Sequence, residues 1–275
     1  MPLKYFYTHF LKWRKPIGWL LLLYLLAGWI FYANQDAFIF RARVIHADKN
    51  VAIQAPHKEI TIPINQEDTL HLISFITDKA PARGVVLYFH GNRENVEWYA
   101  PKADLFTQEG YEVLMMDYPG YGKSRGEISE QKIYQWAIWA YQLARKQFSS
   151  NEIIIYGKSL GTGVAAYLAS VKDCRQLILE TPYTNFPAVF SYYAPIYPFK
   201  TLLQFQFPTE QFLEQVVAPI RILHGTNDFV VAHQHSLQLA KHKKGISLLI
   251  IKGGAHNNLF DFQLTRTTLK KWLSH

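Results

Sequence analysis

The sequence predicts an α/β domain with a mostly parallel central sheet flanked by helices, preceded by an N-terminal transmembrane helix. Residues 17–33 form an uncharged apolar run. From Val85 onward, short and continuously apolar segments alternate with longer helical stretches, which indicates strands buried on both faces. The composition, 49% hydrophobic and 18% charged with 15 Gly, excludes disordered and collagen-like chains. One cysteine excludes a disulfide scaffold.

The charge is positive but concentrated at one end. The chain of 275 residues has 29 basic and 21 acidic side chains, a formal net charge of +8. Half of this excess comes from Lys4, Lys12, Arg14 and Lys15, and no acidic residue precedes Asp36. The remaining surface is only mildly basic, so we expect no nucleic-acid partner.

The apolar run fits a membrane anchor. Residues 17–33 would span about 25 Å as a helix, and Trp19, Trp29 and Tyr32 lie near its ends, as interfacial aromatics do. The basic residues before it predict a cytoplasmic N-terminus and a domain on the far side of the membrane, periplasmic in a bacterium. We therefore expect residues 1–33 to form a retained stub and anchor. The alternatives are a cleaved signal peptide and a core or interfacial helix.

The region after the anchor divides into a linker and a domain. Residues 34–58 are mixed in composition and are interpreted as a juxtamembrane linker that packs onto the domain at residues 59–275. Apolar residues alternate in 60–64 and in 70–75, with a turn-like sequence between them. This pattern predicts an antiparallel hairpin.

The rest of the domain carries the parallel strands. Between them, residues 183–212 are rich in Tyr, Phe and Pro and are interpreted as a cap insertion over one end of the sheet. The six predicted strands are 85–89, 113–116, 153–156, 177–179, 220–223 and 248–251.

A serine motif lies between a predicted strand and a helix. Gly157-Lys158-Ser159-Leu160-Gly161 follows strand 153–156 and precedes the helical stretch 164–170. The pattern G-x-S-x-G in this context predicts a sharp turn that lifts the hydroxyl of Ser159 above the sheet. The alternative is a glycine-rich helix cap. A phosphate-binding loop is excluded, because its lysine would follow the glycines in a different spacing.

A serine nucleophile needs a base, and three histidines follow predicted strands. His90 and His224 stand in turns where they more often order loops. His256 lies in a flexible loop after the last strand, from which it can reach Ser159, and Asp228 one loop earlier can orient its imidazole. The order serine, acid, histidine along the chain is typical of one particular fold.

Five segments carry a family resemblance, and they follow one another in the order that is typical of the family. They are Tyr88–Asn92, Asp117–Ser124, Gly157–Gly161, His224–Asp228 and Gly254–Asn257. The chain resembles the α/β-hydrolase superfamily over roughly residues 60–273. More narrowly, it is similar to membrane-anchored serine hydrolases with a His-Gly-Asn oxyanion loop, near the monoacylglycerol-lipase and serine-aminopeptidase-like branch.

The resemblance implies a role for each motif. It makes Ser159 the nucleophile, His256 the base and Asp228 the residue that orients the base. It also implies an oxyanion hole formed by the backbone N–H groups of Leu160 and Asn92.

Other polar residues receive simpler interpretations. Some relatives place the triad acid after the strand that follows the nucleophile helix, where this chain has Glu180, but we favour Asp228. We expect Lys158 to be solvated or lipid-facing, Asp117 to hold the 119–122 turn, and Cys174 to be structural. The sequence has no metal-ligand spacing and no dinucleotide fingerprint, so we expect neither metal nor cofactor.

These features predict a serine hydrolase that cleaves carboxylic esters through an acyl-enzyme. A peptidase or thioesterase would use the same residues, and a non-catalytic binding protein on the same fold is a further alternative. Other chemistry with the same triad, haloperoxidase-like or lyase, also remains open.

The cap insertion suggests the substrate. We expect its aromatic rings, with Tyr183, Phe186, Phe190 and Tyr193 as the candidate contacts, to roof an acyl pocket and favour a lipid-derived ester. The alternative is that these rings seal the end of the sheet or contact the bilayer.

Overall fold

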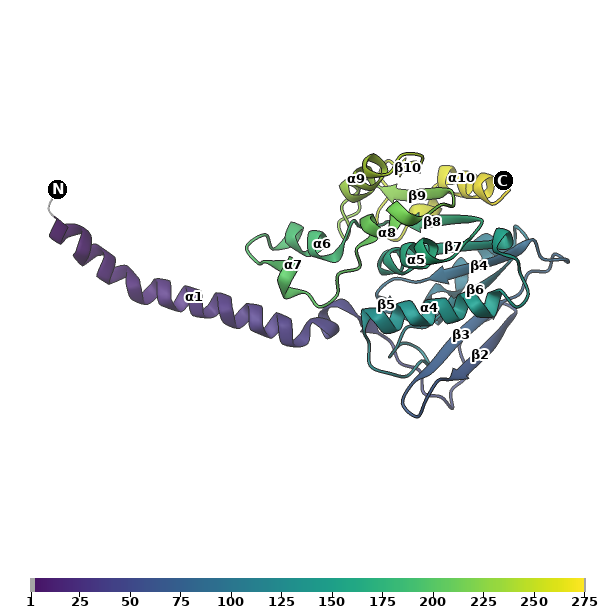
Figure 1. Ribbon diagram of the computed structural model, residues 1–275, viewed down its shortest axis with the longest axis horizontal. Coiled ribbons are helices and arrows are strands. Elements are labelled where there is room, and N and C mark those ends of the chain that lie inside the picture. The colour runs from purple at the N-terminus through teal and green to yellow at the C-terminus, as the bar shows by residue number, and fades with distance from the viewer. Residues whose placement is uncertain (1–2, 275) are drawn as a thin grey trace.

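An eight-stranded sheet forms the centre of the domain, and a long helix, α1 (Leu3–Ile39), extends away from it (Figure 1). The computed structural model describes residues 3–274.

The sheet has the predicted mixture of parallel and antiparallel strands. The strand order is β10-β9-β8-β7-β4-β6-β3-β2, and neighbours from β10 to β6 are parallel. The hairpin strands β2 and β3 are antiparallel, and β3 also runs antiparallel to β6. All six predicted parallel strands and the hairpin are confirmed. The strands are β2 (His57–Pro63), β3 (Thr69–Phe75), β4 (Gly84–Phe89), β6 (Tyr111–Met116), β7 (Ile153–Lys158), β8 (Gln176–Glu180), β9 (Ile220–Gly225) and β10 (Ser247–Ile251).

Helices cover both faces of this sheet. One apolar core joins the sheet to α4, α5, α8 and α9, and a second joins the opposite face to α2, α3 and α10. This double covering explains why the parallel strands are apolar at successive positions. The helices after α1 are α2 (Val96–Tyr99), α3 (Asp104–Thr107), α4 (Glu130–Ala144), α5 (Leu160–Val171), α6 (Phe186–Tyr193), α7 (Phe199–Leu202), α8 (Thr209–Gln215), α9 (Gln234–His242) and α10 (Gln263–Ser274).

The N-terminal apolar run is helical and lies outside the core. Within α1, Lys15–Ile39 is long and apolar enough to span a membrane, and its apolar window is not buried by the domain. The alternative of a core helix is therefore wrong. Membrane anchoring agrees with this helix, and the orientation across the membrane stays a prediction.

The segment after α1 is part of the domain wall. Strand β1 (Arg41–Ala42) pairs in parallel with β5 (Arg93–Glu94) in the loop after β4. The Arg41 N–H donates to the Asn92 carbonyl at 2.8 Å, and the Asn92 side-chain amide donates to the Ile39 carbonyl at 2.6 Å. Residues that we interpreted as a linker thus hold the loop that carries Asn92.

The cap insertion contacts α1. The rings of Tyr24 and Tyr197 stack with centroids 4.6 Å apart, and Phe31 packs edge-on against Phe190 and Phe199 at 5.7 Å and 5.5 Å. Helices α6 and α7 accordingly project from the domain toward α1 (Figure 1). The insertion therefore connects the domain to the apolar helix.

Candidate active site

The predicted strand–turn–helix around the serine motif is present. Ser159 lies between β7 and α5 with φ 51° and ψ −117°, a backbone conformation that is strained for any residue except glycine. A Cβ at Gly157 would collide with the Gly161 carbonyl oxygen, and a Cβ at Gly161 would collide with the Phe89 carbonyl oxygen. Both glycines are needed because backbone segments meet at this turn.

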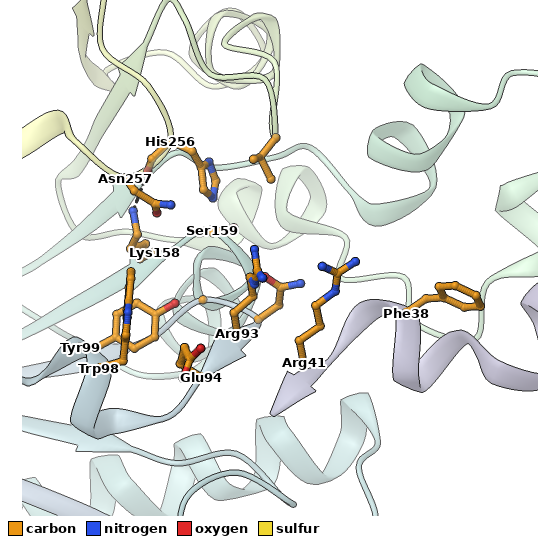
Figure 2. Close-up of a pocket in the computed structure, with 13 residues that line it drawn as sticks. Phe38, Arg41, Arg93, Glu94, Trp98, Tyr99, Lys158, Ser159, His256 and Asn257 are labelled. Carbon is orange, nitrogen blue, oxygen red and sulfur yellow. Dashed lines mark hydrogen bonds between the residues drawn. The ribbon is translucent and has the colours of Figure 1, made fainter. Parts of the chain in front are cut away.

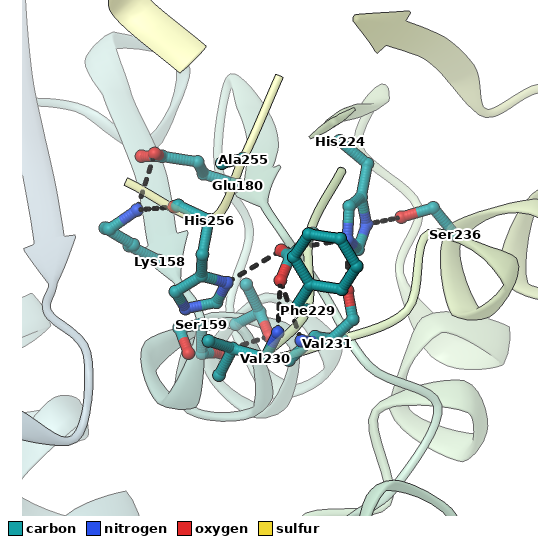
Figure 3. Close-up of polar contacts among 12 residues, drawn as sticks. Lys158, Ser159, Glu180, His224, Phe229, Val230, Val231, Ser236, Ala255 and His256 are labelled. Atoms are coloured by element: carbon teal, nitrogen blue, oxygen red, sulfur yellow. Dashed lines mark hydrogen bonds and ion pairs between the residues drawn. The ribbon is translucent and has the colours of Figure 1, made fainter. Parts of the chain in front are cut away.

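His256 and Asp228 are in direct contact. His256 Nδ1 lies 2.7 Å from Asp228 Oδ2, while Asp228 Oδ1 accepts the N–H groups of Val230 and Val231 at 2.8 Å each (Figure 3). Burial raises the pKa of Asp228, but hydrogen bonds from His224 and His256 outweigh it and hold the pKa well below its usual value. The carboxylate is therefore ionised and fixed in position.

His224 supports this carboxylate from the other side. Its ring is fully buried, with Nδ1 2.6 Å from Ser236 Oγ and Nε2 2.9 Å from the Val231 carbonyl oxygen. Nε2 also lies 3.3 Å from Asp228 Oδ2. Both ring nitrogens are engaged in ordering the loop, as the sequence predicted for this histidine.

The polar contacts of His90 involve residues other than Ser159. Its Nδ1 lies 2.7 Å from the Gly91 carbonyl oxygen, its Nε2 lies 3.7 Å from Asp117 Oδ1, and burial lowers its pKa. Of the three candidate bases, His256 is the one that lines a cavity together with Ser159.

That cavity has a volume of about 490 Å³. Within residues 3–274 no hydrogen bond joins the Ser159 hydroxyl to His256, which is common in unliganded hydrolase sites. The wall is formed by the end of α1, the loop after β4, the serine turn and the two loops that carry the acid and the histidine (Figure 2). Its residues are Phe38, Arg41, Gly91, Asn92, Arg93, Glu94, Trp98, Tyr99, Lys158, Ser159, Val230, His256 and Asn257.

Of the two backbone amides expected to bind an oxyanion, one belongs to the residue after Ser159 and the other to a residue of the cavity wall. Leu160 is the first residue of α5, so its N–H has no acceptor within the helix. The Asn92 carbonyl accepts from the Tyr121 hydroxyl as well as from β1, while its N–H has no protein acceptor in the described part of the chain. Both N–H groups are free to donate to a ligand.

Lys158 corrects one expectation. Its side chain is buried rather than solvated, with Nζ 2.7 Å from Glu180 Oε1 and 2.8 Å from the His256 carbonyl oxygen (Figure 3). The reason is the strand register, which places Lys158 opposite Glu180. Burial raises the pKa of Glu180, but the Lys158 charge and hydrogen bonds from Lys158 and Tyr156 lower it overall. Glu180 is thus bound to Lys158, whereas Asp228 contacts the imidazole.

The aromatic cap residues do not line this cavity. Tyr183 is buried and its hydroxyl donates to the carbonyl of the first residue of α5. Phe186 and Phe190 pack against each other and against neighbouring rings of the insertion, and the Tyr193 hydroxyl donates to the Val230 carbonyl at 3.0 Å. The expectation of a roof over the pocket is wrong for this cavity, because three of the rings pack among the aromatics of the insertion and α1, and Tyr193 is bound to the loop after Asp228.

Sequence reasoning missed several wall residues. Phe38, Arg41, Arg93 and Trp98 line the cavity, although none belongs to a recognised motif. In the sequence, Arg41 is only a basic residue that follows the apolar run. Its place in the site depends on the pairing of β1 with β5. Each of these strands has only two residues, which is too short to predict from sequence.

One protein-family model matches the central part of the chain. A family model described as serine aminopeptidase, S33, matches residues 80–208. This range includes Asn92, Ser159 and Leu160 but ends before Asp228 and His256.

Curated relatives match over a longer range. Alpha/beta hydrolase domain-containing protein 17C of Xenopus tropicalis is 29% identical over 206 residues, which cover 73% of this chain and 65% of the relative. The Homo sapiens protein of the same name is 28% identical, with 73% and 61% covered. The match thus spans less than two thirds of the length of these relatives.

Solved structures share the fold. An esterase from Pyrococcus furiosus superposes with a TM-score of 0.66 at 15% identity, covering 86% of this chain and 97% of the esterase. A soluble variant of monoglyceride lipase from Saccharomyces cerevisiae gives a TM-score of 0.59 at 15% identity, with 83% and 98% covered. The chain therefore has the α/β-hydrolase fold, and its sequence is similar to that of hydrolases.

Proposed function

We propose that the chain is a membrane-anchored serine hydrolase that cleaves carboxylic esters. The observation that carries this proposal is that the strained Ser159 and His256 line one cavity. The Nδ1 atom of His256 is bound by the carboxylate of Asp228, and both oxygens of that carboxylate accept hydrogen bonds. A binding protein would have no use for a strained serine beside an oriented imidazole.

The reaction follows from this geometry. His256 Nε2 removes the hydroxyl proton while Ser159 Oγ attacks the ester carbonyl, and the N–H groups of Leu160 and Asn92 bind the resulting oxyanion. The protonated imidazole then gives its proton to the departing alcohol, which leaves an acyl-enzyme. Water attacks that ester with His256 again as base, releasing the acid and restoring the serine.

Asp228 stabilises the charged intermediate. Because its pKa is held low, its carboxylate stays ionised at neutral pH, and it lies 2.7 Å from Nδ1, which keeps its proton in both the neutral ring and the imidazolium. By accepting the Nδ1 proton, Asp228 also selects the tautomer whose Nε2 is unprotonated and can take the serine proton.

A lipid-derived acyl ester is the substrate class that the surroundings favour. Phe38, the penultimate residue of α1, lines the cavity, so the site adjoins the helix that we assign to the membrane. An acyl chain entering from a bilayer would pass this end of the helix. With the N-terminus in the cytoplasm, the catalytic domain would lie on the far side of the membrane.

The direct test is labelling by a fluorophosphonate probe, followed by hydrolysis of 4-nitrophenyl esters of increasing acyl length. We expect the wild-type chain to be labelled at Ser159 and the Ser159→Ala variant to be unlabelled, with kcat/KM rising beyond acetyl because each buried methylene contributes about 0.8 kcal/mol. Absence of labelling in folded protein would favour a binding role. Matched thioester and 4-nitroanilide substrates separate thioesterase and peptidase activity from esterase activity.

A further inference from the structure

Two arginines line the cavity that contains the serine. Arg41 on β1 and Arg93 on β5 are partners in the parallel register, and both line the cavity that contains Ser159. Figure 2 shows the two guanidinium groups extending from their strands toward the same side. Paired positions on adjacent strands place side chains on one face, so the register itself brings these groups together.

Neither guanidinium has an acidic partner among the side chains that the structure describes. The other charged wall residues are already matched, since Glu94 lies 3.9 Å from Arg43 and Lys158 is paired with Glu180 at 2.7 Å. The wall therefore carries two surplus positive charges. Paired guanidinium groups beside a cavity suit an oxyanion with several acceptor oxygens, which they can bind through parallel N–H donors.

We propose that Arg41 and Arg93 form a binding site for an anionic group, carboxylate or phosphate, on the ester that Ser159 cleaves. This inference rests on the proposed esterase function and narrows its substrate to acidic esters. Arg93 directly follows Asn92, whose N–H we assign to the oxyanion, so an anion bound at the pair belongs to the molecule undergoing reaction. Because Arg41 comes from the segment after α1, this part of the site forms only when that segment is docked.

The test compares two lipids that differ by one phosphate, in the full-length chain in phosphatidylcholine nanodiscs. The pair is 1-decanoylglycerol and 1-decanoylglycerol 3-phosphate. For a carboxylate on the acyl side, 4-nitrophenyl pentanoate is compared with the 4-nitrophenyl monoester of glutaric acid. We expect kcat/KM to favour the anionic member of at least one pair by about tenfold or more, the contribution of a charged hydrogen bond.

Substitution assigns the preference to the pair. Arg41→Gln and Arg93→Gln should each lower the anionic-to-neutral ratio of kcat/KM by about tenfold. The control is Lys146→Gln, an exposed cation just after α4 that does not line the cavity, which should leave the ratio unchanged. A wild-type ratio at or below one in both pairs, with the neutral esters hydrolysed, overturns the anion site while the esterase function stands.

A binding measurement decides the inference without turnover. Isothermal titration of hexyl phosphate into the full-length Ser159→Ala chain should give about tenfold tighter binding than into the Ser159→Ala/Arg93→Gln chain. Equal binding by the two chains overturns the anion site even if no ester is cleaved. Absence of hydrolysis with retained selective binding would refute the esterase function alone.

Anionic headgroups of the bilayer are the other source of the same chemistry. Repeating the kinetics in nanodiscs that contain phosphatidylglycerol separates the two sources. If the arginines serve the bilayer, their substitution will change activity only in the anionic nanodiscs and leave the substrate ratio in phosphatidylcholine untouched. That result would overturn a substrate site.

Discussion

Lys158 connects the nucleophile turn to the histidine loop. Its replacement tests whether it stabilises the fold, positions the imidazole of His256, or does both. The ammonium group is bound to Glu180 and to the backbone carbonyl of His256, and both charged side chains are almost completely buried. Lys158→Met keeps the length and apolar stem of the side chain but deletes the charge. Glu180 then stays buried with only the Tyr156 hydroxyl as a partner.

The size of the effect follows from this burial. Removing one partner of a buried ion pair lowers the free energy of unfolding by about 3–5 kcal/mol. The double variant Lys158→Met/Glu180→Gln has no buried charge, so its free energy of unfolding should return to within about 1–2 kcal/mol of wild type. Both variants lack the bond to the His256 carbonyl, so kcat should stay reduced in both if that bond positions the imidazole.

The pH dependence of the free energy of unfolding provides a second test of this pair. In the wild type the folded-state pKa of Glu180 is lowered, so the pair stabilises the fold above the unfolded pKa, and this contribution is lost as pH falls through the folded pKa. Without Lys158, burial alone raises the pKa of Glu180, and its protonated form is the better buried species. The stability deficit of Lys158→Met should therefore shrink from neutral pH toward about pH 5.

Urea unfolding and ester kinetics on the same preparations provide both readouts. The expected pattern is low stability and low kcat in the single variant, but restored stability with low kcat in the double variant. If the double variant recovers kcat together with stability, Lys158 supports the fold and does not position His256. A loss below about 1 kcal/mol in the single variant would contradict the buried-pair argument.

Four further outcomes are expected. Ser159→Ala should abolish ester turnover and leave the unfolding midpoint unchanged, and turnover above a few per cent of wild type would point to another nucleophile. Asp228→Asn should lower kcat by roughly 10³–10⁴, whereas Glu180→Gln should act mainly on stability by leaving a buried ammonium unpaired; a larger kcat loss in Glu180→Gln would make Glu180 the triad acid. Deletion of residues 1–33 should release an active soluble hydrolase, whereas deletion of 1–43 should remove β1 and most activity; equal activity of the two products would mean that β1 does not support the Asn92 loop. Protease added outside spheroplasts should digest the catalytic domain, and protection of that domain would contradict the proposed topology.

Much of the fold and of the candidate site was predictable because its signals are local. The continuous apolarity of segments such as 153–156 reflects burial on both faces of a parallel sheet. Gly157 and Gly161 mark a turn that excludes any side chain at either position. The positions of Asp228 and His256 after successive strands follow from the rule that the carboxyl ends of parallel strands meet at one edge.

The sequence by itself thus determined the sheet, the serine turn and the edge at which the polar loops gather. Tertiary structure alone decided what each wall residue touches. Lys158 is buried because strand register places it opposite Glu180, and Arg41 reaches the cavity because two short strands pair across 50 residues of chain. Several aromatic rings of the cap pack against α1 and not into the cavity, because the apolar helix beside the domain offers a surface that they can bury. Such pairings depend on which distant segments of the chain come into contact. The local pattern of residue types in one segment does not predict these contacts.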